Sequence, residues 1–311
     1  MKHFADRLAE TTLAKASQVV VGLDPRLERM PAEVIEDAFD KHGRTPRGAA
    51  AAIVGFNRAV LDAVEPHAVA VKPQVAFYER YGVEGMRAYA ETIAAARERG
   101  LIVIGDVKRN DIASTAAAYA AAHLGANGGD GTDAADFHAD AITINPYLGA
   151  DGVLPFLEAA EAHGRGAFAL VKTSNPSSVD IQDVTCEGRP LFERIARLTE
   201  QWGASHVGHC GYSLLGAVVG ATFPEQLRPL RELMPHTPFL VPGFGAQGAG
   251  PEDVAGAFDP DGLGAVVNSS RGIIFAWQRA PYDERFGEGR WREAVAAAAA
   301  AMRQQLWDVT H

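Results

Sequence analysis

Short runs of apolar residues recur along the chain, and each is followed by a longer stretch with helical character. Runs of apolar and β-branched residues that end in charge or glycine are typical of strands. They predict eight strands, at 19–23, 68–71, 101–106, 141–145, 167–171, 216–220, 239–241 and 264–267. The stretches between them predict helices at 48–64, 83–99, 112–123, 152–163, 191–202, 224–233 and 251–258, and an alanine-rich helix at 291–307 closes the series.

Eight strand–helix alternations predict an α/β fold in which residues 1–311 form a single (β/α)8 TIM barrel. A doubly wound open sheet is the alternative, because pattern alone places element boundaries poorly. Three insertions interrupt the alternation, at 24–46, 125–138 and 173–190, and the last is long enough to act as a lid. None has the length or the low-complexity composition of an interdomain linker, so we expect one domain.

Composition narrows the class of protein. The 311 residues are 47% hydrophobic and 22% charged, which is enough apolar material for a sizeable core. The formal charge of −10 argues against nucleic acid as a partner. Cys186 and Cys210 have no metal or redox spacing and are expected to be buried thiols. No signal peptide and no apolar run of membrane-spanning length is found, so we expect a soluble cytoplasmic protein without a membrane partner.

The stretch 105–112, Gly-Asp-Val-Lys-Arg-Asn-Asp-Ile, concentrates charge at the end of the third predicted strand. Asp106 and Lys108 lie two residues apart and therefore project from the same face of a strand. Asp111 follows just beyond, where it could flank the same ammonium. A lysine held between carboxylates at the mouth of a parallel sheet indicates acid–base chemistry more than packing.

Polar residues stand at the ends of most of the other predicted strands as well. In a barrel these ends all face one rim, where active sites are built. The residues concerned are Asp24, Lys72, Asp106, Lys108, Asn145, Lys172, Ser174, Gln247 and Arg271. We assign no role to Lys172.

The ends of the last two strands indicate a phosphate site. Gly243, Gly245 and Gly248 let the backbone approach a ligand closely, and Arg271 offers a fork of donors for phosphate oxygens. Alone, the glycines could equally be turn residues. An arginine in the corresponding loop of the next strand favours phosphate.

The surroundings of Lys108 predict its chemical role. Nearby carboxylates favour its protonated form, which disfavours a Schiff base and favours a general acid that delivers a proton to a carbanion. A substrate carboxylate placed beside Asp106 would be repelled, and loss of CO2 would relieve that repulsion. The alternative is a buried ion-pair network with a structural role only.

These residues resemble the orotidine 5′-phosphate decarboxylase family. Its Asp-x-Lys-x-x-Asp-Ile signature is met by Asp106, Lys108, Asp111 and Ile112, with Thr115 in the expected place after it. The resemblance extends over nearly the whole chain, through 22–25, 71–73, 173–176, 242–247 and 270–272. The insertions are similar to those of the longer bacterial subgroup that includes the mycobacterial and myxobacterial enzymes.

The resemblance implies a reaction and a set of roles. Orotidine 5′-monophosphate would lose CO2 to give UMP, Lys108 would protonate C6, and Asp106 would press on the substrate carboxylate. Lys72 and Asp24 would bind the ribose hydroxyls and belong to the charge network. Ser174 would contact the amide edge of the pyrimidine. Gln247 and Arg271 would bind the phosphate. Asp111, Ile112 and Thr115 would reach the neighbouring subunit's site in a homodimer. Family members use no metal, flavin or other cofactor.

Two other functions remain open from the sequence. A hexulose-phosphate synthase or keto-gulonate-phosphate decarboxylase carries a similar motif but uses Mg²⁺ to stabilise an enediolate. Ile112 and the Arg109-Asn110 pair favour the orotidine branch. A non-catalytic phosphate-sugar sensor would have lost the charged residues that this chain retains. Ser174 could also be an ordinary turn serine in Ser-Asn-Pro.

Overall fold

Eight parallel strands close into a barrel in the computed structural model, which describes residues 2–125, 137–245 and 248–311. The strands are β1 (Val19–Leu23), β2 (Ala70–Pro73), β3 (Ile102–Arg109), β4 (Ala141–Ile144), β5 (Gly166–Lys172), β8 (Leu215–Val219), β9 (Phe239–Pro242) and β10 (Ala265–Ser269). β1 closes the barrel, because Val20 pairs with Asn268 of β10 and with Ala70 of β2. The predicted TIM barrel is therefore confirmed, and the open-sheet alternative is wrong.

The burial of the strands explains why their sequences are apolar without alternation. All five residues of β1 and all five of β8 are buried. One face of each strand points into the barrel and the other is covered by the helix layer, so both faces lose contact with water. Strands of this kind appear in the sequence as short continuous apolar runs, which is why all eight were predictable within a few residues.

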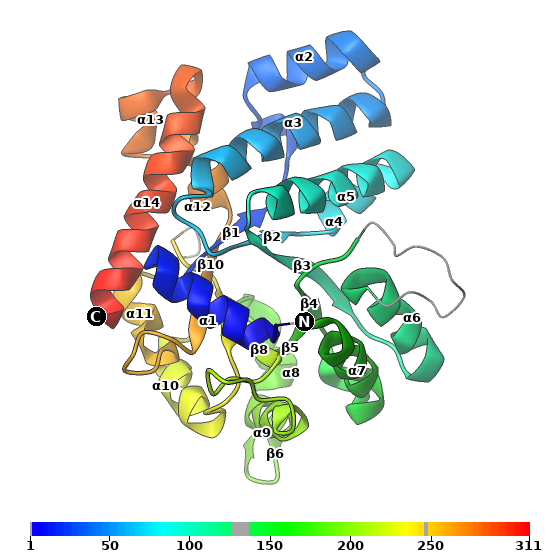
Figure 1. The fold of residues 1–311 in the computed structure, drawn as a ribbon. Coiled ribbons are helices and arrows are strands. Elements are labelled where there is room, and N and C mark those ends of the chain that lie inside the picture. The colour runs from blue at the N-terminus through cyan, green and yellow to red at the C-terminus, as the bar shows by residue number, and fades with distance from the viewer. Residues whose placement is uncertain (1, 126–136, 246–247) are drawn as a thin grey trace.

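Helices surround the strands on the outside of the barrel (Figure 1). Those that follow the strands along the chain include α3 (Pro46–Val64), α5 (Gly82–Glu98), α6 (Ala113–Leu124), α7 (Leu154–His163), α9 (Leu191–Gly203), α10 (Pro224–Leu233) and α14 (Trp291–Thr310). Their ends follow local chemistry: Thr45 caps α3 by accepting a hydrogen bond from the Gly48 N–H, and Gly164 ends α7 in the left-handed region at φ 60°. Short helices α4 (Ala76–Glu79), α11 (Pro251–Val254), α12 (Arg271–Ile274) and α13 (Tyr282–Phe286) lie in the connections.

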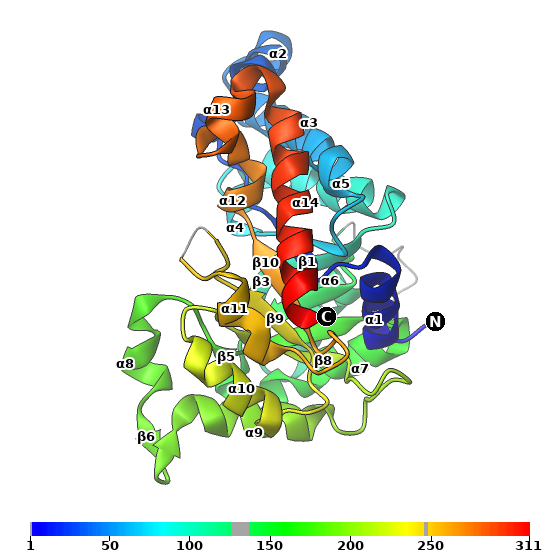
Figure 2. The ribbon, with the colours of Figure 1, turned by 90° about the vertical axis from the view of Figure 1, so that its left-hand side faces the viewer.

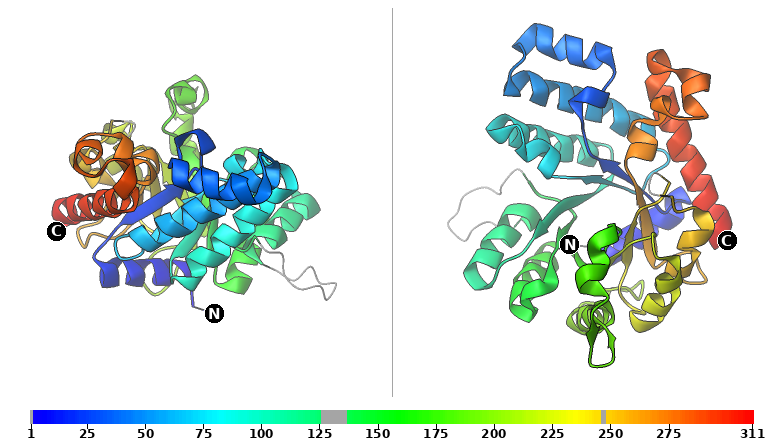
Figure 3. Two further views of the ribbon diagram at one scale, coloured as in Figure 1. Left: turned by 90° about the horizontal axis from the view of Figure 1, so that it is seen from above. Right: turned by 180° about the vertical axis from the view of Figure 1, so that it is seen from behind.

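Helix α1 (Phe4–Lys15) was not predicted, and it covers one end of the barrel. The ring of Phe4 meets that of Phe168 edge-on at 6.0 Å, and a side chain on Gly166, where β5 begins, would collide with it. α1 therefore closes the end at which the strands begin. Figures 2 and 3 show α1 on the side of the barrel opposite to α8 (Val179–Gln182), which leaves the carboxyl ends of the strands as the face for a site.

The predicted insertions differ in what they contain. Within 24–46 lie the short 3-10 turn η1 (Leu27–Arg29) and the helix α2 (Ala32–His42), which packs on α3. Within 173–190 lie α8 and a small antiparallel hairpin, β6 (Thr185–Cys186) and β7 (Arg189–Pro190). Most of the predicted insertion 125–138 falls outside the described residues.

Two expectations from composition can be compared with the described residues. Cys186 and Cys210 are unpaired thiols, but each is partly exposed, so the expectation of buried thiols is wrong. Across residues 2–125, 137–245 and 248–311, no helix combines the length and the apolar character needed to cross a bilayer.

Candidate active site

Asp106 holds two lysines at the carboxyl end of the barrel. Lys72 Nζ lies 2.5 Å from Asp106 Oδ2, and Lys108 Nζ lies 2.5 Å from Asp106 Oδ1. Lys72 lies on β2 and the other two residues lie on the neighbouring β3, so the strand order brings them together. One carboxylate thus binds one ammonium on each of its oxygens, and these three of the predicted strand-end residues lie together.

Burial strengthens the interactions between the charges of Lys72, Asp106 and Lys108, because little water screens them. Lys72 and Asp106 are each only 6% exposed, whereas the Lys108 side chain is 47% exposed and faces solvent at the barrel mouth. Burial by itself raises the pKa of Asp106, but the two ammonium groups outweigh it and hold that pKa well below its ordinary value. Burial likewise disfavours charge on Lys72, but the carboxylates of Asp106 and Asp24 raise the pKa of Lys72 above its ordinary value.

The hydroxyl of Thr143 ties the backbone around Lys108 to Asp106, a contact that the sequence did not reveal. It accepts hydrogen bonds from the N–H groups of Val107, at 3.1 Å, and Lys108, at 3.0 Å, and donates to Asp106 Oδ1 at 3.0 Å. The register between β3 and β4 shifts here, and Lys108 has a left-handed φ of 44°. Such a backbone is rare outside glycine and persists only where neighbouring contacts hold it.

Asp24 and Asn268 supply unsatisfied acceptors at the same end of the barrel. Asp24 Oδ1 and Asn268 Oδ1 are buried, and neither has a hydrogen-bond partner among the described residues. They lie on the adjacent strands β1 and β10 or directly after them. Buried acceptors without partners are costly, so a ligand that brings hydroxyl donors would be favoured here.

Asp111 does not flank Lys108 within one chain, so that expectation is wrong. In the described part of the chain, no ion pair within 4 Å joins the two residues, and the Asp111 carboxylate accepts only from the Ile112 N–H, at 2.9 Å. Ile112 and Thr115 are exposed, Ile112 to 48%, and Asp111 is partly exposed.

Positive charge gathers where the last two strands end. Arg271 begins α12 and is exposed, and Arg279 Nη1 lies 3.7 Å from the position that a Cβ on Gly272 would take. Burial lowers the pKa of Arg29, and the nearby positive charges of Arg26, Arg271 and Arg279 lower it further. Within the described ranges, no carboxylate lies within ion-pair distance of Arg26, Arg271 or Arg279. The sequence pointed to Arg271 alone among these arginines.

The structure gives less information on the two remaining candidate residues, Gln247 and Ser174. Gln247 lies outside the described residues, while Gly245 and Gly248 beside it have φ values of 71° and 105°. Ser174 follows β5, and its carbonyl accepts a hydrogen bond from Thr222 Oγ1 at 3.2 Å. Across the ranges that the structure describes, no three His, Cys, Asp or Glu side chains come together as a group that could hold a metal ion.

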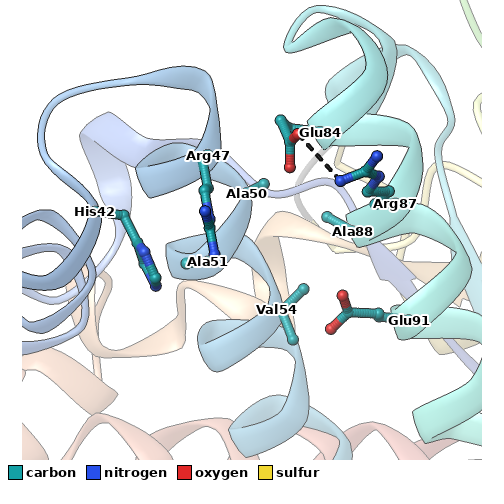
Figure 4. Close-up of a pocket in the computed structure, with 9 residues that line it drawn as sticks. All are labelled: His42, Arg47, Ala50, Ala51, Val54, Glu84, Arg87, Ala88 and Glu91. Carbon is teal, nitrogen blue, oxygen red and sulfur yellow. Dashed lines mark hydrogen bonds and ion pairs between the residues drawn. The ribbon is translucent and has the colours of Figure 1, made fainter.

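A separate cavity of about 420 Å³ lies between α3 and α5 on the outside of the barrel (Figure 4). Arg47, Glu84, Arg87 and Glu91 are among the residues around it, and Arg87 donates to Glu84 at 3.3 Å. Its lining contains none of the strand-end residues described above. The mixed charges around this cavity favour no particular ligand. We therefore place the candidate site at the barrel mouth, where the strand-end residues lie.

The chain is similar to known proteins over nearly its whole length. A model of the family described as "Orotidine 5'-phosphate decarboxylase / HUMPS family" matches residues 17–280. The orotidine 5′-phosphate decarboxylase of Rhodopirellula baltica is 44% identical over 306 residues, which cover 98% of this chain and 99% of that protein. The enzyme of the same name from Caldicellulosiruptor saccharolyticus is 43% identical over 278 residues, 89% of this chain and 91% of that one.

A solved structure agrees with these relatives. The structure of Leishmania donovani OMP decarboxylase superposes with a TM-score of 0.71 at 32% sequence identity, covering 97% of this chain and 99% of that chain. The family description includes a second name, but both of these relatives and the Leishmania structure carry the decarboxylase name. The similarity covers the strands that hold Lys72, Asp106 and Lys108.

Proposed function

This chain belongs to the orotidine 5′-phosphate decarboxylase family, the carboxy-lyases of pyrimidine biosynthesis, and we propose that Lys108, Asp106 and Lys72 carry out its chemistry. The reaction converts orotidine 5′-monophosphate to UMP and CO2. The observation that carries the proposal is the Asp106 carboxylate, buried and bound at 2.5 Å by one ammonium on each oxygen.

The proton transfer is assigned to Lys108. When the bond between C6 and the carboxylate breaks, CO2 leaves and the electron pair stays on C6. The Lys108 ammonium, half-exposed at the mouth, donates a proton to that carbon and becomes an amine, which then regains a proton from water. A fixed ammonium beside the developing negative charge also stabilises the transition state.

Asp106 and Lys72 set the electrostatics for this step. Because the pKa of Asp106 is held low, the group stays a carboxylate and repels a substrate carboxylate placed next to it. Departure of neutral CO2 relieves that repulsion. Lys72 compensates the buried charge of Asp106 from the other side, so that Lys108 can give up its proton without leaving the carboxylate unpaired.

Binding of the rest of the substrate is assigned to the groups around this centre. Asp24, with its unsatisfied oxygen, would accept from a ribose hydroxyl, and Ser174 would meet the pyrimidine amide edge. Arg271 and Gln247 would bind the phosphate, with the positive charges of Arg26 and Arg279 adding to the attraction. No cofactor enters this scheme.

We also propose a homodimer with shared sites, in which Asp111, Ile112 and Thr115 serve the partner's barrel mouth. Large apolar side chains are exposed around these residues: Ile112 (48%), Tyr119 (37%), Tyr147 (78%), Leu148 (44%) and Leu154 (40%). The segments before α6 and before α7 adjoin, because the Asp111 carbonyl oxygen and Leu148 Cβ both lie 3.2 Å from the Cβ position of Gly152. Exposed large apolar side chains gathered on adjoining segments are typical of a protein interface.

We infer a cytoplasmic location from the biosynthetic role and the two unpaired cysteines.

The test of the function is turnover of orotidine 5′-monophosphate by protein treated exhaustively with a chelator, followed by the loss of orotate absorbance. Undiminished turnover is the expected result, and it would exclude the magnesium-dependent alternative. No turnover before or after treatment would contradict the proposal. Turnover that is lost on chelation and restored by Mg²⁺ would favour the alternative.

A further inference from the structure

Lys172, the last residue of β5, is a fully buried lysine outside the Lys72–Asp106–Lys108 cluster. Its side chain is 0% exposed, and its Nζ lies 2.6 Å from Asp183 Oδ1. The ammonium also lies over two aromatic rings, at 4.3 Å from the centroid of Phe223 and 5.3 Å from that of Phe192. This ion pair therefore attaches the insertion 173–190 to the barrel through Asp183, the residue that follows α8.

The same insertion is bound a second time, directly next to Ser174. Gln182, the last residue of α8, accepts from the Thr173 N–H at 2.9 Å and donates to Thr173 Oγ1 at 2.8 Å. On its other side, the Ser174 carbonyl accepts from Thr222. Gly220 packs so closely that a Cβ there would lie 2.8 Å from Ser174 N. The backbone of Ser174 is thus held from both sides, and one side depends on α8.

The charge of Lys172 makes this attachment specific. A buried ammonium is tolerated only with a partner, because an unpaired buried charge costs far more than the pair gains. Asp183 is the carboxylate within ion-pair distance of it among the described residues, so keeping Lys172 paired requires α8 to stay where it is. An apolar side chain of the same length would fill the space but would not hold the helix in one place.

We propose that Lys172 is a positioning residue for recognition of the pyrimidine base. Through Asp183 it fixes the end of α8, through Gln182 that helix fixes Thr173, and Thr173 fixes the adjacent Ser174. The inference rests on the proposed function, in which Ser174 meets the base. It predicts that the attachment matters for ligands with a base and not for ligands that present the ribose phosphate alone.

The test compares two ligands that share the ribose phosphate. Dissociation constants for UMP and for ribose 5-phosphate are measured by calorimetry on the intact protein with Asp183→Asn, Gln182→Ala and Lys172→Met. We expect UMP binding to weaken about tenfold or more in each variant, with ribose 5-phosphate binding changed less than about twofold. Asp183→Glu, which keeps the carboxylate, should restore most of the UMP affinity.

A matched control lies in the same insertion. Glu187→Gln removes the exposed ion pair with Arg194, at 2.9 Å, and should leave both affinities unchanged. If Lys172→Met does not fold, the partly exposed Asp183 and Gln182 still provide the test. Equal loss of both ligands, or no loss of either, would overturn the proposal. Failure of the wild-type chain to decarboxylate orotidine 5′-monophosphate would instead overturn the proposed function.

Discussion

The Thr143 hydroxyl accepts a hydrogen bond from the backbone N–H of Lys108 at 3.0 Å. Because that hydroxyl also donates to Asp106, one buried group sets both the backbone turn that aims Lys108 and the orientation of its counter-ion. The proton donor is thus placed by a residue to which the proposed mechanism gives no contact with the substrate.

Replacing Thr143 with valine should therefore damage catalysis more than binding. Valine has nearly the same shape but leaves the N–H groups of Val107 and Lys108 without this acceptor and removes one of the two hydrogen bonds to Asp106 Oδ1. Such losses cost about 1–3 kcal/mol, so kcat should fall roughly ten- to a hundredfold. UMP affinity should change little, and Thr143→Ser should recover most of the rate. Steady-state kinetics measure kcat, and calorimetry measures the affinity for UMP. A Thr143→Val enzyme with normal kcat would refute this role.

Removing the Asp106 carboxylate should destabilise the protein strongly at neutral pH. Asp106→Ala removes the carboxylate that pairs with the buried Lys72 and leaves that ammonium next to Lys108, which we expect to cost about 3–5 kcal/mol of unfolding free energy. Urea unfolding at pH 7 measures the difference. A well-exposed pair gives the control, since Asp37→Ala breaks only the surface contact with Lys41 and should change stability by less than about 1 kcal/mol.

The pKa directions add a pH dependence to this stability. The folded pKa of Asp106 is lowered, so its contribution is present above the unfolded value of 3.8 and is lost as pH falls through the folded pKa. The folded pKa of Lys72 is raised, so its contribution is present below 10.5 and is lost as pH rises through the folded pKa. The difference in stability between wild type and Asp106→Ala should accordingly be flat from about pH 5 to 9 and shrink in strong acid.

The shared-site dimer predicts complementation between two inactive proteins. In a heterodimer of Lys108→Ala and Asp111→Ala subunits, one site carries both changes and the other carries neither. Equal mixing with full exchange should thus restore about a quarter of the wild-type activity. Light scattering should give twice the mass of the 33.0 kDa chain. Exchange without recovery of activity would mean that Asp111 does not act across the interface.

Phosphate recognition can be separated from base recognition at Arg271. Loss of charge-assisted hydrogen bonds costs about 1.5–3 kcal/mol, so Arg271→Gln should weaken UMP binding by roughly ten- to a hundredfold. Uridine, which has no phosphate, should bind wild type and variant alike. Arg303→Gln, on the outer helix α14, is the matched control and should bind UMP normally. An equal effect of Arg271→Gln on UMP and uridine would show that this residue does not bind phosphate.

The strands and the charged strand ends were predictable because each has a local signature. Continuous apolar runs mark buried parallel strands, and Lys72, Asp106 and Lys108 stand where those runs end. A barrel then gathers these ends at one rim whatever the details of the connections. This is why the Lys72–Asp106–Lys108 cluster could be expected before its geometry was known.

The site contacts that were not predicted depend on the path of the backbone in the folded chain. Thr143 looks like any strand-forming residue in Ala-Ile-Thr-Ile, and nothing marks a left-handed lysine two residues after Asp106. Asp111 forms no ion pair with Lys108 among the described residues, although their spacing suggested contact. Arg279 lies eight residues beyond Arg271, and only the folded connection brings it back to Gly272. Contacts of this kind arise from tertiary structure and have no signal in a single sequence.

The proposed mechanism depends above all on Lys108 as the proton donor, and replacing that lysine puts the role to the test. Turnover of orotidine 5′-monophosphate and affinity for UMP are measured side by side for wild type, Lys108→Ala and the surface control Lys41→Ala. We predict that Lys108→Ala binds UMP but that its kcat falls by about 10²–10⁴-fold. Lys41→Ala should have the turnover and the UMP affinity of the wild type. A Lys108→Ala protein with near-normal turnover would show that another group delivers the proton.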